Sequence, residues 1–469
     1  MRLARRALIA SLLASPAVAR AQEPAAALHD LARQAAIYLF PVYEMYRARW
    51  RATVDESNEL RQRLNRFLHL PALADHHARL VTMPNNDTLY SSAWLDLSTE
   101  PMFLTVPPVG DHYYSYTFID LFTNSVAQVS HRLYGGEPPT HMIVGPAWQG
   151  DASFEVKLVR APTSSVWLLG RVLVDGPDDL DRVRTLQERV LLETPDMRNE
   201  RRILESRELM RQRAFAPPEP VADWPAPRPD DPFDLFKVGA RALGESPLGE
   251  RDKAVLQGFA PLRLRPGKFD LRAFDERDRS AILSGIEQGH VDIRAAGRRY
   301  GRTIDGWSYG ERHLGNFGDD YLYRAFVALT GLGALEPAEA VYMTSSADAE
   351  GRPLSGASRY TLTFPSGGLP PARAFWSLAL YEVTPEGRAY FVDNPIGRYA
   401  IGDRTPELHT AADGSLTICL QRERPGDAEA AANWLPAPAG PMRLVLRAYE
   451  PEDALIEGRY RVPAVKRVG

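Results

Sequence analysis

The chain has 469 residues and a mass of 52.3 kDa, which is more than one hydrophobic core usually organises, so two or three domains are expected. Hydrophobic residues make up 44% of the sequence and charged residues 25%, the proportions of an ordinary globular protein. The net charge of −4 offers none of the basic excess that nucleic-acid binding uses, so no nucleic-acid partner is expected.

Residues 1–21 have the features of a cleavable export signal. An arginine-rich start at residues 2–6 precedes an apolar run at residues 7–18, and residues 19–21 form a small-x-small cleavage site. The run is shorter than the ~20 residues that span a bilayer, and no later segment qualifies, so no membrane span is expected. The mature protein should therefore begin at Gln22 and be periplasmic or secreted, and Arg5-Arg6 also fits a twin-arginine signal.

Residues 22–80 are predicted to form a helical N-terminal segment. Apolar residues recur at helical spacing twice, at residues 28–38 and again at residues 60–68. Pro41 is expected to end or kink the first of these helices, and Pro71 to close the second.

Residues 81–190 change to short β-type runs and are predicted to form a first β-domain. The clearest strands are residues 113–122 and residues 166–174, the second of which is almost continuously apolar and should be central. Asp178 is then expected to cap a helix.

Residues 191–310 are predicted to be a helical middle region that contains a proline-rich linker at residues 215–231. Helical patterns follow at residues 232–244 and 279–297. From residue 311 to 469 the chain returns to strands, which predicts a second β-domain.

Four segments rich in polar and aromatic residues carry a family resemblance: residues 84–94, 369–377, 394–404 and 433–438. Together they resemble the tandem bacterial family in which domain of unknown function 1254 is followed by domain of unknown function 1214. The resemblance implies an immunoglobulin-like β-sandwich followed by a C-terminal jelly-roll-like β-sandwich. The expected fold class is therefore mainly β, with helical N-terminal and middle regions.

Two groups of polar residues in the first β-domain are candidates for chemistry. Asn86, Asp87 and Tyr90 either form a turn that launches a strand or converge on a ligand, for which they supply donors and acceptors. Asp120 is predicted to share a strand face with Tyr116 and other aromatics, so that burial should raise its pKa.

Asp120 has two open interpretations. It is either a structural hydrogen-bond partner of a nearby loop or, with Asp87 and Tyr90, part of an acid–base site. Asn124 and Tyr116 are candidate ligand contacts beside it.

In the second β-domain the candidate ligand contacts are Arg398 and Trp376. Arg398 can clamp a carboxylate or phosphate, although arginines in such positions more often pin a loop. Trp376 is predicted to be buried in the second sandwich.

No metal site and no cofactor is predicted. Asp75-His76-His77 and the scattered histidines lack the spacings of known metal motifs. Ser91, Ser92 and Ser377 carry no local signature of an activated nucleophile, and the glycine-rich stretches do not follow strands as in nucleotide-binding folds.

Three functions fit these residues, and whether the protein is an enzyme stays open. The first is a metal-independent enzyme acting on a small, partly apolar molecule near the junction of the β-domains. The second is a periplasmic binding or carrier protein for an apolar ligand. The third is a structural protein that forms homo-oligomers.

Overall fold

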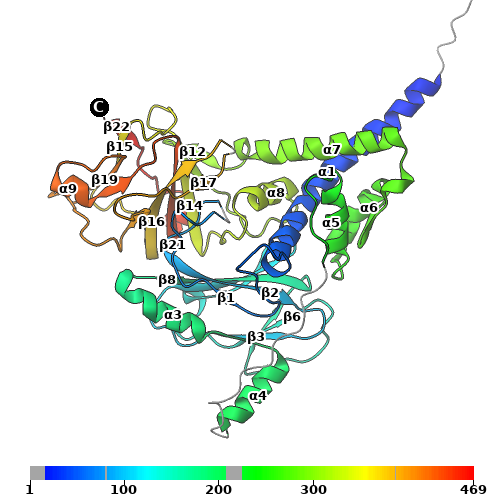
Figure 1. Cartoon of the computed structure of the whole chain (residues 1–469), viewed down its shortest axis with the longest axis horizontal. Helices are drawn as coiled ribbons and strands as arrows, with labels where there is room; N and C mark the ends of the chain where they lie inside the picture. The colour runs from blue at the N-terminus through cyan, green and yellow to red at the C-terminus, as the bar shows by residue number, and fades with distance from the viewer. Residues whose placement is uncertain (1–15, 80–81, 207–223, 386, 469) are drawn as a thin grey trace, which may run out of the picture.

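The computed structural model describes residues 16–79, 82–206, 224–385 and 387–468. Two β-sandwiches and a layer of helices make up the molecule, which confirms a mainly β fold with helical N-terminal and middle regions (Figure 1). The predicted export signal is described only from residue 16 and the predicted linker only from residue 224, so their other residues lie outside the described parts.

The first sandwich packs a five-stranded sheet on a four-stranded sheet, with a core that includes Leu89, Tyr116 and Leu168. The strand predicted at residues 113–122 is β4 and the one at 166–174 is β8. β8 lies between β2 and β4 and is buried on both faces, which explains its almost continuous apolar sequence. In sheet order, the strands are β1 (Leu68–His69), β2 (Thr88–Asp96), β8 (Ser165–Leu173), β4 (Tyr114–Asp120) and β5 (Ser125–Ser130), then β7 (Lys157–Arg160), β6 (His141–Val144), β3 (Met102–Thr105) and β9 (Leu191–Glu193).

The second sandwich packs a seven-stranded sheet on a four-stranded sheet. Trp376, Leu378 and Leu446 belong to the core between the sheets, and Trp376 is only 3% exposed, as its predicted burial requires. The strands are β12 (Arg302–Ile304), β13 (Trp307–Tyr309), β14 (Ala340–Ser345), β21 (Met442–Pro451), β16 (Ala372–Val383), β17 (Ala389–Tyr390) and β18 (Ala400–Gly402), then β20 (Trp434–Pro436), β19 (Leu416–Gln421), β15 (Arg359–Phe364) and β22 (Lys466–Val468).

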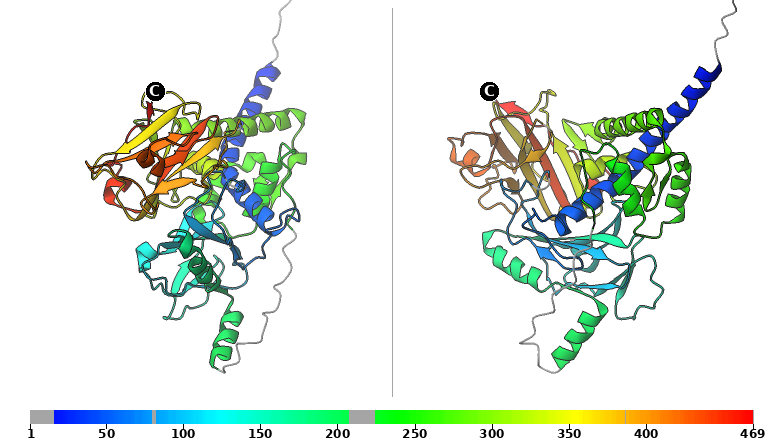
Figure 2. Two further views of the ribbon diagram at one scale, coloured as in Figure 1. Left: turned by 60° about the vertical axis from the view of Figure 1, so that its left-hand side comes forward. Right: turned by 45° about the vertical axis from the view of Figure 1, so that its right-hand side comes forward.

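A layer of helices covers one side of both sandwiches (Figures 1 and 2). The long helix α1 packs along α7, and two glycines of α7 allow the close approach: a Cβ on Gly285 would lie 2.3 Å from the carbonyl oxygen of His29, and one on Gly289 would lie 2.8 Å from Ala36 Cβ. The main helices of the layer are α1 (Pro16–Thr53), α5 (Asp234–Leu243), α6 (Glu250–Gly258), α7 (Glu276–Ala295) and α8 (Tyr321–Thr330).

The sequence predicts that Pro41 ends or kinks the first helix. The helix does not end there, because α1 continues to Thr53, so this part of the prediction is wrong. A proline inside a helix costs about 3 kcal/mol. Here the residues on both sides of Pro41, from Tyr38 to Tyr46, are buried against other helices and the first sandwich, and this packing holds the helix together.

The second helix predicted before residue 80 does not form. Residues 60–68 instead run along β2: the Asn65 N–H donates to the carbonyl of Trp94, and Leu68 pairs with Ser92. Asn65 has the positive φ of 58°, which interrupts any helix. Pairing with a sheet edge therefore overrides the apolar spacing.

The remaining elements are short, and one of them differs from the prediction. Asp178 does not cap α3, because residues Pro177–Asp179 form a 3₁₀ turn and the helix begins at Leu180 without a side-chain cap. The remaining short elements are α2 (His131–Tyr134), α3 (Leu180–Glu188), α4 (Pro195–Ser206), α9 (Ala428–Ala432), α10 (Asp453–Ile456), β10 (Leu264–Arg265), β11 (Lys268–Phe269), and the 3₁₀ turns η1 (Pro177–Asp179), η2 (Ala260–Leu262), η3 (Leu271–Ala273) and η4 (Ala296–Arg298).

The described end of the predicted linker is docked onto α1. The Trp50 indole N–H donates to the carbonyl of Trp224 at 3.0 Å, and the Tyr46 hydroxyl donates to that of Pro225 at 3.0 Å. Within the described part of the chain, every helix is too short or too polar to cross a membrane.

Candidate functional site

The two sandwiches meet through the outer faces of their larger sheets. On each of these faces a tyrosine, an arginine and a serine stand side by side on neighbouring strands, because residues directly opposite each other in a sheet share a face. These six residues, termed the junction rows, are Tyr90, Arg171 and Ser115 on β2, β8 and β4, and Tyr342, Arg447 and Ser377 on β14, β21 and β16.

Both arginines of the junction rows are 5% exposed. Arg171 Nη2 donates to the carbonyl of Gly333 at 2.7 Å and its guanidinium lies 5.3 Å from the Tyr90 ring centroid, while Nη1 has no hydrogen-bond partner. Arg447 donates to the Tyr381 hydroxyl and to the carbonyl of Met83, each at 2.9 Å. In the described residues no carboxylate oxygen lies within 4.0 Å of either guanidinium.

The phenols around the two arginines do not neutralise them. Burial raises the pKa of Tyr381 to about 12, against the opposing effect of Arg447. Burial also raises the pKa of Tyr342, which interacts with both Arg171 and Arg447, and that of Tyr449. All three phenols are therefore neutral at pH 7 and act as hydrogen-bonding groups.

Asp87 connects the two sandwiches. Its carboxylate accepts a hydrogen bond from Ser377 Oγ at 2.6 Å and one from Arg404 Nη2 at 2.9 Å, both of them residues of the second sandwich. Its backbone N–H donates to Asn85, whose Nδ2 donates to the Tyr449 hydroxyl at 2.7 Å. Arg404 pairs directly with Asp87, which also favours the charged form of Arg447 from a longer distance, so no carboxylate of the described residues pairs directly with Arg171 or Arg447.

Two further carboxylates lie at the edge of the junction. Glu339 is fully buried, and it accepts from Arg132 Nε at 2.8 Å and from the Tyr113 hydroxyl at 3.1 Å. Asp403 accepts from the Trp376 N–H at 3.3 Å, and burial raises its pKa to about 6 although Arg404 opposes the shift. Asp403 therefore titrates close to neutral pH.

Asp120 and Asn124 lie in the turn between β4 and β5. Asp120 Oδ1 accepts from the N–H groups of Phe122 and Asn124 at 2.9 and 2.8 Å, and Oδ2 accepts from Asn124 Nδ2 at 2.9 Å. Burial raises the Asp120 pKa to about 6, and the hydrogen bonds from Asn124 oppose this shift. The predicted direction of the pKa shift is confirmed, and these contacts are those of a turn anchor.

The structure separates the other predicted site residues. Tyr116 fills the core of the first sandwich, where a Cβ on Gly170 would lie 2.4 Å from its ring. Asn86 donates to the carbonyl of Ala74 at 2.6 Å.

The candidates of the second sandwich also lie away from the arginines. Arg398 donates to the carbonyls of Ala432 and Trp434 at 2.8 and 3.0 Å, so it pins loops of the second sandwich, and Trp376 is part of the core there. Asp87 and Tyr90 alone among the eight candidates adjoin the arginines.

A serine–histidine pair lies away from the junction, under β1. His69 Nδ1 is 2.8 Å from Ser91 Oγ, to which Gln187 also donates at 3.1 Å. Burial lowers the pKa of His69, so the ring is neutral at pH 7. Ser91 is fully buried in the first sandwich, so this hydroxyl does not reach solvent.

Arg171 and Arg447 were not among the predicted site residues, although the sequence contains a signal for both. Each stands within a run of apolar strand residues, Arg171 between Leu169 and Val172 and Arg447 between Leu446 and Ala448. Arginine is almost never fully buried unless it is paired, so a lone arginine inside such a run marks a special environment.

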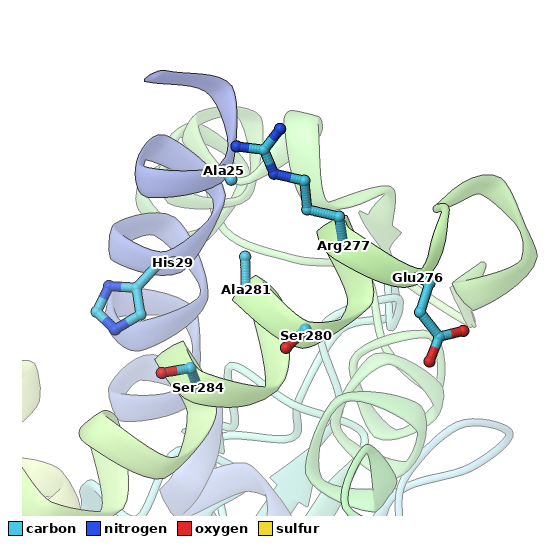
Figure 3. Close-up of a pocket in the computed structure, with 7 residues that line it drawn as sticks. All are labelled: Ala25, His29, Glu276, Arg277, Ser280, Ala281 and Ser284. Atoms are coloured by element: carbon cyan, nitrogen blue, oxygen red, sulfur yellow. The ribbon is translucent and has the colours of Figure 1, made fainter. Parts of the chain in front are cut away.

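Two hollows open on the surface. A hollow of about 220 Å³ has Tyr342 among its lining residues, together with Arg302, Arg312, Glu311 and Glu457. A wide groove of about 620 Å³ lies between α1 and α7 (Figure 3). In that groove the side chains of His29 and Glu276 point away from each other, so its polar groups do not converge on one point.

Comparisons with known proteins agree with this architecture. Residues 64–194 match the model described as "Protein of unknown function (DUF1254)" and residues 339–453 match "Protein of unknown function (DUF1214)". The first match covers the first sandwich and the second covers most of the larger sheet of the second sandwich. The fold thus defines a protein of two β-sandwiches joined by helices, and the chain belongs to the tandem DUF1254–DUF1214 family.

A solved structure of a similar protein shows the same fold. The VPA0106 protein from Vibrio parahaemolyticus is 24% identical, with a TM-score of 0.70 over 94% of this chain and 100% of that one. An uncharacterized protein from Burkholderia cenocepacia is 13% identical, with a TM-score of 0.43 over 96% of this chain and 95% of that one. No curated protein matched the sequence.

Proposed function

We propose that this protein binds a small, partly apolar organic anion at the junction of the two sandwiches. The observation that carries the proposal is that Arg171 and Arg447 are buried and that none of the carboxylates in the described parts of the chain pairs directly with them. A buried charge is strongly unfavourable unless it is paired, so these guanidinium groups need a counter-charge from outside the chain. A carboxylate meets this need best because it accepts two parallel N–H bonds from one arginine.

The surroundings of the arginines favour a ligand with an aromatic or aliphatic body. The rings of Phe375, Tyr113 and Tyr449 pack together beside the arginines, with the Phe375 and Tyr449 rings stacked at 4.2 Å between centroids. Neutral phenols next to the guanidinium groups can donate further hydrogen bonds to a carboxylate. Tyr342 also lines the hollow of about 220 Å³, which supports an approach from the surface on this side.

Binding without turnover is favoured over catalysis. Asp87, one predicted catalytic residue, has both carboxylate oxygens engaged by Ser377 and Arg404. Asp120, another of the three predicted catalytic residues, holds a turn through three hydrogen bonds. A general base needs an accessible lone pair within hydrogen-bond reach of its substrate.

We also propose that binding takes place outside the cytoplasm. The support is the sequence of the first 21 residues, with its basic start, short apolar run and small-residue cleavage site. Protein isolated from the native host should begin at or near Gln22, as measured by N-terminal mass spectrometry. An intact Met1 on that protein would contradict export.

The test of binding compares acids with their neutral amides. Melting temperatures are measured with benzoate, 4-hydroxybenzoate and octanoate, and with the three matching amides at the same concentrations. We expect at least one acid to raise the melting temperature while its amide does not, because binding to the folded state stabilises it.

Two variants extend this test: one removes a proposed anion-binding residue, and the other is its control. Arg171→Gln should lose the shift, whereas Arg373→Gln, which changes an exposed arginine of β16, should keep it. Equal shifts for acids and amides, no shift with any acid, or a retained shift in Arg171→Gln would each contradict the proposal.

A further inference from the structure

Asp75, His76 and His77 form a compact group of metal-ligating side chains outside the junction. One ligand atom from each residue lies within 4.8 Å of the other two. Bonds of about 2.0–2.2 Å from an ion to nitrogen or oxygen ligands place two ligand atoms at most about 4.4 Å apart. Only small side-chain adjustments are therefore needed for all three atoms to reach one ion.

The segment that carries these residues is held in place by the second sandwich. Ala74 packs against a small core that includes Tyr381 and Phe391, and its carbonyl accepts from Asn86 Nδ2 at 2.6 Å. Arg79 donates to Glu382 at 2.8 Å and to the carbonyl of His76 at 3.0 Å. A backbone fixed at both ends of the group reduces the entropy lost when a ligand is bound.

Two residues of the second sandwich complete the surroundings of His76. The Tyr399 hydroxyl is 2.7 Å from His76 Nδ1, and Asp393 Oδ1 is 3.9 Å from the same nitrogen. A hydrogen-bond partner that fixes the ring orientation is typical of metal-binding histidines. Asp393 Oδ1 approaches the nitrogen that Tyr399 occupies, so both residues hold the ring from this side and leave His76 Nε2 for an ion.

The sequence predicted no metal site because Asp75-His76-His77 does not follow a known metal motif. The fold supplies what spacing in the sequence lacks, since Tyr399 and Asp393 lie more than 300 residues further along the chain. His77 is exposed and His76 and Asp75 are partly buried, so an ion has access from solvent and can keep water as a remaining ligand.

We propose that Asp75, His76 and His77 bind one divalent transition-metal ion of the zinc class, with Tyr399 and Asp393 of the second sandwich holding the His76 ring. Imidazole nitrogens with carboxylate oxygens form a ligand set that suits zinc, copper and nickel. All three ligands come from the segment before β2, and the loop after β17 supplies the residues that orient His76. The site does not depend on the anion site proposed above.

The test uses Zn²⁺ as the probe and untagged full-length protein that has been dialysed against a chelator. Competition with a chromophoric zinc indicator gives the stoichiometry and the affinity. We expect one ion per chain, and at least a tenfold lower affinity in the double variant His76→Gln/His77→Gln. The control His29→Gln removes a partly exposed histidine on α1 and should bind as the wild type does.

Unfolding in chelator checks that the double variant is folded, since its melting temperature without metal should equal that of the wild type. Addition of Zn²⁺ should raise the melting temperature of the wild type only. Equal Zn²⁺ affinities in wild type and double variant, or no binding at micromolar Zn²⁺, would overturn the site. An unchanged affinity in Asp393→Asn would overturn the role of Asp393.

Discussion

The helical layer and the junction each contain a buried arginine, but the two guanidinium groups have different partners. In the helical layer Arg49 is 1% exposed and donates two parallel hydrogen bonds to Glu245, at 2.7 and 2.9 Å, with the Trp224 ring 3.6 Å from its guanidinium carbon. In the junction Arg171 has one carbonyl and one aromatic face as partners.

This difference separates a structural charge from one kept for a ligand. In a buried ion pair the chain supplies both the cation and the anion, so no ligand is needed to balance the charge. A buried cation without a counter-ion lowers the stability of the folded protein until an anion arrives. The same substitution at Arg49 and at Arg171 should therefore have opposite effects.

The largest effect is expected at Arg49. Arg49→Met removes both bonds to Glu245 and leaves that carboxylate, which is only 22% exposed, without its partner. We expect a loss of about 3 kcal/mol in the free energy of unfolding, measured by urea denaturation with tryptophan fluorescence. A loss below about 1 kcal/mol would show that the pair does not stabilise the helical layer.

The second prediction applies the same reasoning to a buried carboxylate. The folded pKa of Asp120 is about 6, above the value of about 3.9 in the unfolded chain. The folded state therefore binds more protons between these values, and this contribution to stability is present below about pH 4 and lost as pH rises to 6. Asp120→Asn removes the titration.

Urea denaturation of both proteins at pH 4.5 and pH 7.5 measures this effect. Relative to the wild type, Asp120→Asn should gain about 2 kcal/mol between the two pH values, because about 1.5 pKa units lie between pH 4.5 and the folded pKa and each unit corresponds to about 1.4 kcal/mol. Other titrating groups are shared by the two proteins and cancel in the difference. Parallel stability curves would show that the carboxylate is not perturbed by burial.

Much of the fold could be predicted from the sequence, because local patterns decide it. The alternation in β4 and the apolar run in β8 identify central strands, and the motifs of both sandwiches identify the family. The failures have a tertiary cause. Residues 60–68 have helical spacing but pair with β2, and α1 passes Pro41 because packing on both sides outweighs a lost hydrogen bond.

The site was harder to predict, because it is made by two sheets meeting. Asp87 and Tyr90 were recognised from a local motif, but their partners Ser377, Arg404 and Arg171 lie 81 to 317 residues away. The spacing of residues along the sequence does not predict such contacts. The partners of a charged residue within an apolar strand become known only when the facing sheet is placed.

The smallest expected effect is also the most direct test of the account. Arg171→Met keeps an unbranched, flexible side chain that is shorter than arginine, removes the buried charge and gives up one hydrogen bond to Gly333. Urea denaturation of exhaustively dialysed, ligand-free protein should show Arg171→Met to be more stable than the wild type by about 1 kcal/mol, since relief of the unpaired charge exceeds the loss of one hydrogen bond. If Arg171→Met instead loses stability as Arg49→Met does, the Arg171 charge is part of the structure and the anion site is contradicted.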